Sequence, residues 1–287
     1  MLAVLAPAKL NLTLEVLGNR PDGYHEVRSV IQAINLCDSL NFQSSRNVSF
    51  RSGMPDWAPE KSLVSRAVNL LQETTGSSEG VSIEVIKRIP LMSGLGGDSS
   101  DTAATLHGLN KLWNLGLTRE KLLDLAAQLG SDVAFFLYGG TALVEGRGEM
   151  VNPLPSLSCQ WIVLVLPDVP RLPGKTKQLY ASLNPSHYTD GQVTAKLVSA
   201  LREGREFVPS LLFNTFENVA FTYFSGLNTY QEQLVKAGAD NIHLAGSGPT
   251  LFSMVDDRTR AEEMLCYLEG QGVEAYLADT LTAVDQT

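Results

Sequence analysis

Hydrophobic and polar residues alternate strictly over residues 10–16, which read Leu-Asn-Leu-Thr-Leu-Glu-Val. A period of two predicts a β-strand with one apolar and one polar face. Successive side chains of a strand point to opposite faces, so the polar face carries the residues of one parity: Lys9, Asn11, Thr13 and Glu15. A second extended segment is expected over residues 27–42, and the alternation over residues 81–86 predicts a third strand.

The rest of the chain combines helical patterns with further short strands. Apolar residues at helical spacing predict four helices, at residues 63–71, 103–112, 118–129 and 261–268. Short apolar runs predict strands at residues 161–166, on both sides of a glycine turn within 241–255, and at 273–277. Residues 49–59 are expected to form a loop. Because strands and helices mix without a regular βαβ repeat, the pattern favours an α+β fold.

A proline-rich stretch at residues 152–157 is the best candidate for a domain boundary. A chain of 287 residues fits one large domain or two smaller ones. We therefore expect an N-terminal domain over residues 1–150 and a C-terminal domain over residues 151–287.

Composition narrows the classes of partner. The net charge of −9 and the pI near 5.0 provide no general attraction for nucleic acid or an anionic membrane. The longest wholly apolar run, residues 161–166, is far shorter than the roughly 20 residues of a membrane span, and the first residues lack the pattern of a signal peptide. Cys37, Cys159 and Cys266 form no C-x-x-C pair, so reduced thiols in a cytoplasmic protein are expected.

The most informative motif is a glycine loop between a predicted strand and a predicted helix. Gly94, Gly96 and Gly97 let the backbone approach a ligand closely, and the helix start that follows suits a phosphate. The loop is neither a Walker loop nor a dinucleotide fingerprint, because the required lysine and third glycine are missing. The alternative is a flexible turn in which Ser99 or Ser100 caps the helix.

Four further features have structural and functional interpretations. The glycine turn at residues 245–249 joins two predicted strands and is, alone, typical of a bulged hairpin. Asp132 is either a helix N-cap or a carboxylate that accepts a proton. Considered by itself, Lys9 is interpreted as a lysine exposed to solvent, and the pair Tyr24-His25 as part of an exposed loop. None of these features by itself indicates a function.

Together, and in this order, the motifs resemble a known family. They are Pro7-Ala-Lys-Leu-Asn-Leu12, Arg20-Pro-Asp-Gly-Tyr-His25, Lys87-Arg-Ile-Pro90, Gly94-Leu-Gly-Gly-Asp-Ser-Ser-Asp101, Gly130-Ser-Asp-Val133 and Gly246-Ser-Gly248. This set is similar to that of the GHMP kinases, the superfamily that includes galactokinase, homoserine kinase, mevalonate kinase and phosphomevalonate kinase. The Asp-Gly-Tyr-His element resembles the members that act on 4-diphosphocytidyl-2-C-methyl-D-erythritol.

The resemblance implies a fold and a reaction. The N-terminal domain would resemble domain 2 of ribosomal protein S5, and the C-terminal domain would be ferredoxin-like, with ATP and substrate in the cleft between them. The implied reaction transfers the γ-phosphoryl group of ATP, with Mg²⁺, to the 2-hydroxyl of the cytidine diphosphate substrate. This is a step in the non-mevalonate route to isoprenoid precursors. We expect a monomer or a weak homodimer, although the sequence does not determine the oligomeric state.

The resemblance also assigns roles to residues. Asp132 would accept the proton of the attacking hydroxyl, and Lys9 would keep Asp132 ionised. The ATP site would comprise Leu63, Lys87, Pro90, Leu91, Met92, Ser93, Gly94, Leu95, Gly96, Gly97, Asp98, Ser99 and Ser100. The substrate site would comprise Asn11, Tyr24, His25, Thr176 and Tyr180, with the cytosine between the rings of Tyr24 and Tyr180. Ser100 and Asp98 are both candidates to hold Mg²⁺.

Three departures from the family pattern qualify the resemblance. Asp98 replaces a small residue, Ser62 stands where an asparagine often precedes the leucine matched by Leu63, and residues 168–175 differ from the usual loop. Two rival interpretations follow. One is a kinase for another small alcohol, which the aromatic residues of the predicted cytosine site disfavour. The other is a non-catalytic nucleotide-binding protein, which only the negative charge of Asp98 supports.

Overall fold

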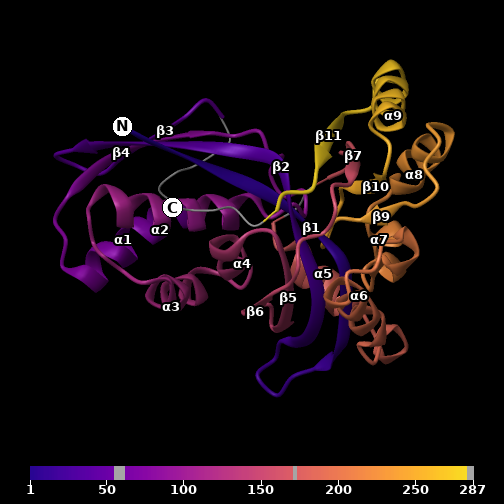
Figure 1. Ribbon diagram of the computed structural model, residues 1–287, viewed down its shortest axis with the longest axis horizontal. Helices are drawn as coiled ribbons and strands as arrows, with labels where there is room; N and C mark the ends of the chain where they lie inside the picture. Colours follow the sequence, from indigo (N-terminus) through magenta and orange to yellow (C-terminus); the bar gives the residue numbers. More distant parts are fainter. Residues whose placement is uncertain (55–61, 171–172, 283–287) are drawn as a thin grey trace. The chain divides into compact units, whose positions relative to one another are not determined.

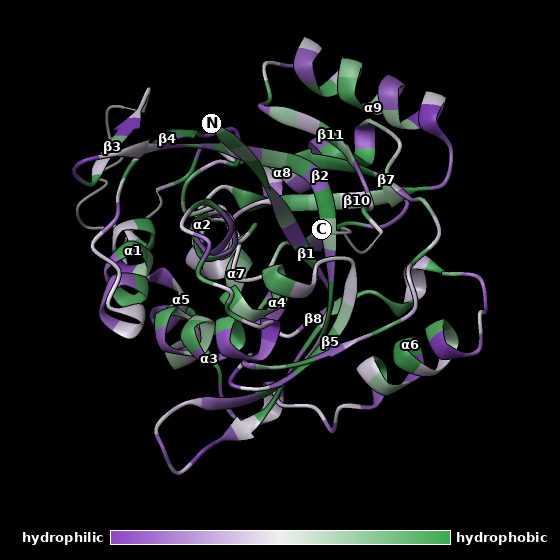
Figure 2. Cartoon of the chain, turned by 60° about the vertical axis from the view of Figure 1, so that its left-hand side comes forward, coloured by the Kyte–Doolittle hydropathy of each residue, from purple (hydrophilic) through white to green (hydrophobic). Residues whose placement is uncertain are grey.

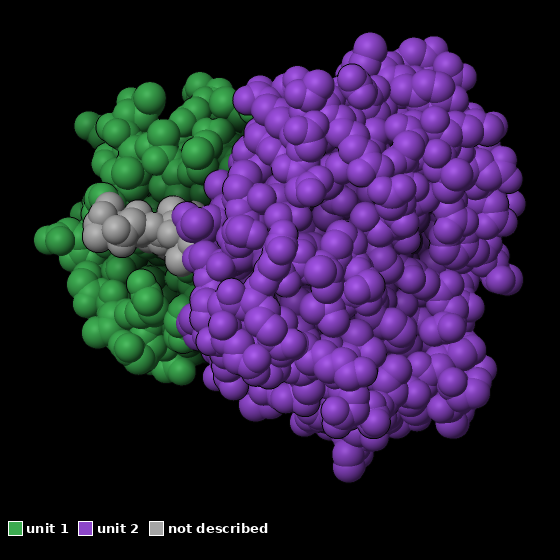
Figure 3. Space-filling model, turned by 45° about the vertical axis from the view of Figure 1, so that its right-hand side comes forward, with its two compact units in different colours: residues 1–8, 36–91, 96–138 green, residues 9–35, 92–95, 139–287 purple. Residues whose placement is uncertain are grey.

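Figure 1 shows the computed structural model of the chain, which describes residues 1–54, 62–170 and 173–282. The chain folds into two compact units, which Figure 3 marks in different colours. Unit 1 comprises Met1–Ala8, Leu36–Leu91 and Gly96–Tyr138, and unit 2 comprises Lys9–Asn35, Met92–Leu95 and Gly139–Thr287. Two long strands, β1 (Leu2–Asn19) and β2 (His25–Ser45), contribute residues to both units.

In its described residues, unit 1 combines strands with four helices. β4 (Gly80–Ile86) pairs antiparallel with residues 39–45 of β2 and parallel with β3 (Ser49–Ser52). The helices pack against one another, and they are α1 (Leu63–Thr75), α2 (Gly97–Leu112), α3 (Arg119–Leu129) and α4 (Val133–Tyr138). Gly108 of α2 approaches the sheet so closely that a Cβ atom there would lie 2.7 Å from the ring of Phe42.

Unit 2 contains further strands of the first sheet and a second sheet. In the first sheet, the early part of β2 pairs with β5 (Thr141–Gly146), β5 pairs with β6 (Met150–Pro153), and β1 pairs parallel with β8 (Phe213–Asn214). The second sheet has the order β11-β7-β10-β9. Its strands are β7 (Trp161–Val165), β9 (His243–Leu244), β10 (Leu251–Val255) and β11 (Ala275–Asp279).

The helices of unit 2 are interspersed with its strands along the chain. They are α5 (Lys175–Ser182), α6 (Gln192–Arg202), α7 (Glu217–Tyr223), α8 (Leu227–Lys236) and α9 (Arg258–Gly270), with short 3₁₀ turns at Pro185–His187 and Pro209–Leu211. α9 carries its buried residues at helical spacing, and its other faces are more hydrophilic (Figure 2). Buried residues from β7, β10, α7 and α9 belong to one hydrophobic cluster.

The first predicted strand is present, but its polar face is buried. The structure confirms a strand over residues 10–16, which lie within β1. Lys9 and Asn11 are each 5 % exposed, and Thr13 and Glu15 are fully buried. The interpretation of Lys9 as a solvated lysine is therefore wrong. Buried polar side chains need hydrogen-bond partners, so this face of β1 points to a site rather than to solvent.

Other expectations need correction at their boundaries. Residues 49–52 form strand β3, so part of the expected loop is wrong, and residues 55–59 of that loop lie outside the described part of the chain. α2 begins at Gly97 rather than after the loop, which makes Ser99 and Ser100 part of its first turn. The capping of this helix by Ser99 or Ser100 is wrong, because its N-cap is Gly96. β5 and β6 were not anticipated.

Strands and helices mix in both units, in agreement with the α+β expectation. The boundary near residue 150 stays a prediction. Cys37, Cys159 and Cys266 are free, as expected. Among the described helices, none is long and apolar enough to cross a membrane.

Candidate active site

β1 positions the predicted catalytic lysine in unit 2. The ammonium of Lys9 donates a hydrogen bond of 2.7 Å to Oδ1 of Asn11. Nδ2 of Asn11 donates in turn to Oγ of Ser29 over 2.8 Å. The backbone N–H of Lys9 donates to the carbonyl of Leu95, so β1 also holds the start of the glycine loop. Lys9 and Asn11 thus lie side by side, as the parity of the strand predicts.

The two glycine motifs are in direct contact within unit 2. A Cβ atom on Gly94 would lie only 2.1 Å from the carbonyl oxygen of Ala245 and 2.9 Å from the N atom of Gly248. Gly94 also has a φ of +91°, which disfavours any L side chain. Thr250 donates its N–H to the carbonyl of Ser93 next to this contact. Only glycine fits at position 94, because both space and backbone conformation exclude a side chain.

The second glycine turn also borders the lysine. A Cβ atom on Gly246 would lie 2.9 Å from the carbonyl oxygen of Gly94, 3.1 Å from Nζ of Lys9 and 3.2 Å from Oδ1 of Asn11. Strand β1, residues 92–95 of the first glycine loop and the second glycine turn therefore converge at one place in unit 2. The bulged-hairpin interpretation of the turn accounts for its position between strands but not for this convergence.

Two buried side chains hold the second glycine turn from outside the motif. Asn214 of β8 donates to the carbonyls of Leu244 and Gly246, each over 2.8 Å. The ammonium of Lys175 donates to the carbonyl of Gly248 and lies 3.3 Å from Oγ of Ser247. Asn214 is 2 % exposed and Lys175 is 6 % exposed. The turn is therefore shaped by contacts with residues far from it in the sequence.

The predicted cytosine site also lies in unit 2. The rings of His25 and Tyr180 are stacked, with centroids 4.6 Å apart and planes 24° apart. Tyr180 also packs edge-on against Phe216. Tyr24 is 54 % exposed, and the guanidinium of Arg147 lies 4.9 Å from the centre of its ring. The structure therefore places the ring of His25 against that of Tyr180. The neighbouring residue in the chain, Tyr24, has its ring covered by the guanidinium of Arg147.

Burial lowers the pKa of His25 below its usual value of 6.5. Its imidazole is therefore neutral at neutral pH, with one ring nitrogen as donor and the other as acceptor. This arrangement suits hydrogen bonding to the edge of a base.

Thr176 lies at the start of α5, one residue after Lys175. Its hydroxyl is 2.9 Å from Oγ of Ser247 in the second glycine turn. Since Tyr180 belongs to the same helix, α5 connects the ring pair with the glycine turn. Thr176 and Tyr180 follow a segment, residues 168–175, that departs from the family pattern, and both lie in this group of contacts.

In unit 1, the start of α2 has the features expected of the predicted phosphate site. Its N-cap is Gly96, and no side chain caps the first turn, so backbone N–H groups point away from the helix. Asp98 lies in this first turn with its side chain 61 % exposed. Among the described residues, Oγ of Ser100 and Oδ1 of Asp101 are buried without a hydrogen-bond partner. The unpartnered oxygen of Ser100 suits Mg²⁺, which prefers oxygen ligands, whereas the other carboxylate oxygen of Asp101 binds the ammonium of Lys87.

Lys87 lies in a buried ion cluster of unit 1. Its ammonium contacts Asp38 at 2.5 Å and Asp101 at 2.7 Å, and all three side chains are at most 1 % exposed. Asp98 lies 3.9 Å from the same ammonium. Asp38 also accepts hydrogen bonds from the backbone N–H groups of Arg88 and Ile89. Lys87 therefore ties the end of β4 and β2 to the first turn of α2.

The cluster has more negative than positive charge. Burial raises the pKa of Asp101 to about 7, and the nearby Asp38 and Asp98 add to this, whereas Lys87 lowers it. The pKa of Lys87 is raised, because the attraction of the two carboxylates outweighs the effect of burial. Both directions follow from one ammonium shared by two buried carboxylates.

Three other residues discussed in the sequence analysis lie at helix starts in unit 1. Asp132 is half-buried and directly precedes α4. Ser62 is the N-cap of α1 and accepts a hydrogen bond from the N–H of Ser65. Leu63 is the first residue of the same helix. Lys9 belongs to unit 2 and Asp132 to unit 1, so the catalytic pair stays a prediction.

Sequence reasoning missed the residues that hold the motifs in place, which are Ser29, Asp38, Arg147, Lys175 and Asn214. Asp38 could have been recognised as a lone carboxylate in a predicted extended segment. The others have no sequence signal, because each acts through a contact distant in sequence.

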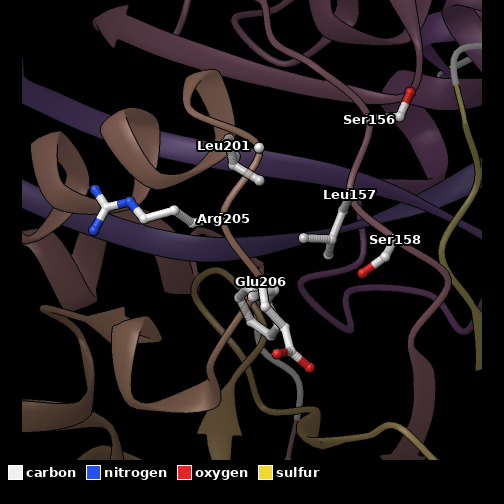
Figure 4. Close-up of a pocket in the computed structure, with 8 residues that line it drawn as sticks. Ser156, Leu157, Ser158, Leu201, Arg205 and Glu206 are labelled. Carbon is white, nitrogen blue, oxygen red and sulfur yellow. The ribbon is translucent and has the colours of Figure 1, made fainter.

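Figure 4 shows a pocket of about 510 Å³ in unit 2. It is lined by residues 156–158 and by residues near the end of α6, including Arg205 and Glu206. None of the predicted site residues lines it, so it plays no part in the site described above.

Comparisons with known proteins agree with this arrangement. A model of the GHMP kinases N terminal domain matches residues 62–140, and a model of the GHMP kinases C terminal domain matches residues 197–274. A relative from Dehalococcoides mccartyi, named 4-diphosphocytidyl-2-C-methyl-D-erythritol kinase, is 50 % identical over 285 residues, covering 99 % of this chain and all of the relative. A relative of the same name from Geobacillus kaustophilus is 39 % identical, covering 94 % of this chain and 93 % of the relative.

Solved structures agree as well. A crystal structure of 4-(cytidine 5'-diphospho)-2C-methyl-D-erythritol kinase superposes with a TM-score of 0.82 at 31 % identity, covering 97 % of this chain and 99 % of that one. Homoserine kinase from Cytophaga hutchinsonii shares the fold, with a TM-score of 0.71 at 21 % identity over 98 % of this chain and 94 % of that one. The chain therefore belongs to the GHMP kinases and, within them, to the family of 4-diphosphocytidyl-2-C-methyl-D-erythritol kinases. The resemblance and the two-domain fold expected from the motifs are confirmed.

Proposed function

We propose that the protein transfers the γ-phosphoryl group of ATP to the 2-hydroxyl of 4-diphosphocytidyl-2-C-methyl-D-erythritol. The reaction belongs to the non-mevalonate route to isoprenoid precursors. The observation that carries this proposal is 50 % identity over 99 % of the chain to a relative of that name. The ring pair of His25 and Tyr180, in the same unit as Lys9, supports a substrate with a base.

Asp132 and Lys9 are the proposed catalytic residues. The substrate oxygen forms a bond to the γ-phosphorus, the bond from that phosphorus to the β–γ bridging oxygen breaks, and ADP leaves. Asp132 accepts the proton of the hydroxyl, and Lys9 keeps this carboxylate ionised and stabilises negative charge near the oxygen. Positioning and charge neutralisation supply most of the rate in such transfers.

The glycine loop, residues 90–100, is proposed to hold the phosphates of ATP. The uncapped N–H groups at the start of α2 supply the hydrogen bonds. Lys87 supports this site by holding Asp101, and Leu63 is proposed to contact the nucleotide. When bound, Mg²⁺ neutralises phosphate charge, and Ser100 and Asp98 are the proposed ligands.

The cytosine is proposed to bind between Tyr24 and Tyr180. His25 provides hydrogen bonds to the base edge, and Asn11 and Thr176 complete the substrate site. In the structure the rings of His25 and Tyr180 are stacked on each other, so a cytosine on Tyr180 takes the place of this contact. Base stacking on an aromatic ring is worth about 1–3 kcal/mol.

A coupled assay of ADP release tests the proposed function. We expect turnover with 4-diphosphocytidyl-2-C-methyl-D-erythritol and almost none with mevalonate or homoserine. Turnover of another alcohol alone would overturn the substrate assignment but not the kinase assignment. Removal of Mg²⁺ with a chelator is expected to abolish turnover. ATP binding without turnover of any alcohol would favour the non-catalytic rival.

The location and the organisation of the protein are proposed from other observations. The three free cysteines of the protein and its proposed use of ATP support a cytoplasmic location. The two matched domain models lie on either side of residue 150 and support a boundary near that position. A monomer or weak homodimer stays a prediction, which sedimentation of the purified protein tests.

A further inference from the structure

We propose that Ser29 is a positioning residue that acts through Asn11 to hold the ammonium of Lys9 in place for phosphoryl transfer. The proposal rests on the proposed function, since it gives Lys9 a catalytic role. Ser29 belongs to none of the recognisable motifs. Its importance follows only from what its hydroxyl contacts.

The three side chains form a buried chain of hydrogen bonds in unit 2. Ser29 is 3 % exposed, and Lys9 and Asn11 are 5 % exposed. Lys9 donates to Asn11 over 2.7 Å, Asn11 donates to Ser29 over 2.8 Å, and Ser29 donates to the backbone carbonyl of Thr13. The chain therefore begins at a cation and ends at a fixed backbone acceptor.

The two ends of this chain determine the direction of every hydrogen bond in it. An ammonium can only donate, so the atom of Asn11 that faces Lys9 must be the carbonyl oxygen. A backbone carbonyl can only accept, so the single proton of Ser29 must point to Thr13. Ser29 then has only lone pairs for Asn11, which must present its NH₂ group. Both ends thus require the same orientation of the Asn11 amide.

The anchor of the chain is itself held firmly. The hydroxyl of Thr13 accepts a hydrogen bond of 2.9 Å from the N–H of Val30, next to Ser29 on β2. Thr194 of α6 also donates to this hydroxyl. β1 and β2 are therefore joined by side chains at the point where Ser29 contacts Thr13. The sheet therefore fixes the backbone of Asn11, and the hydrogen bond to Ser29 fixes the orientation of the Asn11 side-chain amide.

Loss of the Ser29 hydroxyl removes the feature that distinguishes the two orientations of the amide. In Ser29→Ala, the NH₂ group of Asn11 loses its acceptor in a buried place, which is unfavourable. Rotation of the amide would turn this NH₂ group toward the ammonium of Lys9, where two donors cannot pair. The ammonium then samples positions away from the reacting oxygen. We therefore expect a larger decrease in the rate of the chemical step than in the affinity for the substrates.

Steady-state kinetics of matched variants test the proposal. We expect kcat of Ser29→Ala to fall roughly tenfold, as for loss of one orienting hydrogen bond, with KM for ATP and for the alcohol changed less than about twofold. Ser29→Thr keeps the hydroxyl and should retain most of kcat. Ser253→Ala removes another buried serine hydroxyl of unit 2, 1 % exposed on β10, and should leave kcat unchanged.

Combining Ser29→Ala with a variant that lacks Lys9 distinguishes a positioning role of Ser29 from nonspecific damage to the fold. In Lys9→Ala, the further change Ser29→Ala should cost almost nothing in kcat, because Ser29 acts only through the lysine. An equal loss of kcat in both backgrounds would overturn the proposal. Wild-type kcat in Ser29→Ala, or the same loss in Ser253→Ala, would also overturn it.

A spectroscopic readout keeps the proposal testable if the proposed function fails. The ¹⁵N-detected signal of the Lys9 ammonium, assigned by its loss in Lys9→Arg, should shift and broaden in Ser29→Ala but not in Ser253→Ala. An unchanged signal would overturn the positioning role. Absence of turnover by the wild type with every alcohol, combined with the expected signal change, would refute the proposed function alone.

Discussion

At the scale of single residues, charge and burial around Lys87 decide how the start of α2 responds to pH. One buried ammonium is shared by Asp38 and Asp101, and Asp98 adds a third carboxylate at 3.9 Å. Asp101 has a raised pKa of about 7, against 3.8 for an unperturbed aspartate. The folded protein therefore binds a proton at Asp101 more tightly than the unfolded chain does. This contribution to stability is present at low pH and is lost as pH rises through about 7.

We predict that Asp98→Asn weakens this pH dependence. Removing the charge of Asp98 lowers the pKa of Asp101, because Asp98 is one of the groups that raise it. The effect is modest, since the side chain of Asp98 is 61 % exposed and solvent screens it. Urea unfolding across the acid to neutral range should show a smaller decline in the free energy of unfolding than in wild type. The exposed Glu269→Gln serves as control, and an identical decline in Asp98→Asn would refute the prediction.

His25 makes a second pH prediction, concerning substrate binding. Because burial lowers its pKa below 6.5, His25 stays neutral at neutral pH and becomes protonated only in acid. Protonation removes its acceptor nitrogen and puts a charge next to Tyr180. KM for the cytidine diphosphate substrate should be flat around neutral pH and rise below 6.5. In His25→Gln, which does not titrate, this rise should be absent; a rise in that variant would assign it to another group.

At the scale of elements, the site is built where two glycine turns and β1 meet in unit 2. Gly94 touches the turn at Ala245, and Gly246 approaches Lys9 and Asn11. Each turn brings the backbone close, so the contact has no room for a Cβ atom. Lys175 and Asn214 then fix the carbonyls of the second turn. The centre of the site is therefore a backbone contact between the two turns, and the side chains of Lys9 and Asn11 lie against it.

We predict that Gly94→Ala separates the two turns. Its Cβ atom would lie 2.1 Å from the carbonyl oxygen of Ala245, so the backbone must move. The melting temperature should fall by several degrees, and KM for ATP should rise about tenfold or more, as the phosphate loop shifts. Gly116→Ala is the matched control, because Gly116 also has a positive φ but has nothing within 4 Å. Equal effects in the two variants would show that backbone strain, not the close contact, matters.

At the scale of the whole molecule, the proposed catalytic pair draws one residue from each unit. Lys9 belongs to unit 2 and Asp132 to unit 1. Two residues that act on the same step have a kinetic signature, because the effects of removing them do not add. Kinetics can therefore test whether the two residues act on the same step.

We predict that Asp132→Asn lowers kcat by about 10²-fold or more, while the affinity for substrate stays nearly unchanged. Lys9→Ala should lower kcat as well, and the double variant should be little worse than the poorer single variant. Independent losses that multiply in the double variant would contradict the pairing. Unchanged turnover in Asp132→Asn would remove Asp132 from the mechanism.

The sequence predicted helices and strands well where the spacing of hydrophobic residues within a short segment was sufficient to identify them. The alternation of β1 and the helical spacing of α9 both depend on neighbours within a few residues, and both elements formed as expected. The pattern missed β5 and β6, which are short and whose pairing partners lie elsewhere. It also placed the start of α2 too late, because glycine and serine at the helix start do not follow the apolar spacing.

By itself, the sequence determined the order of the motifs, the family and the parity that puts Lys9 beside Asn11, because these depend on residue type and local spacing. Only the tertiary structure decided that this polar strand face is buried, that Lys87 is shared by two aspartates, and that Ser29 orients the amide beside Lys9. Each of these facts arises from contacts between segments distant in sequence. A residue's environment, unlike its local conformation, is set by whatever the folded chain packs against it.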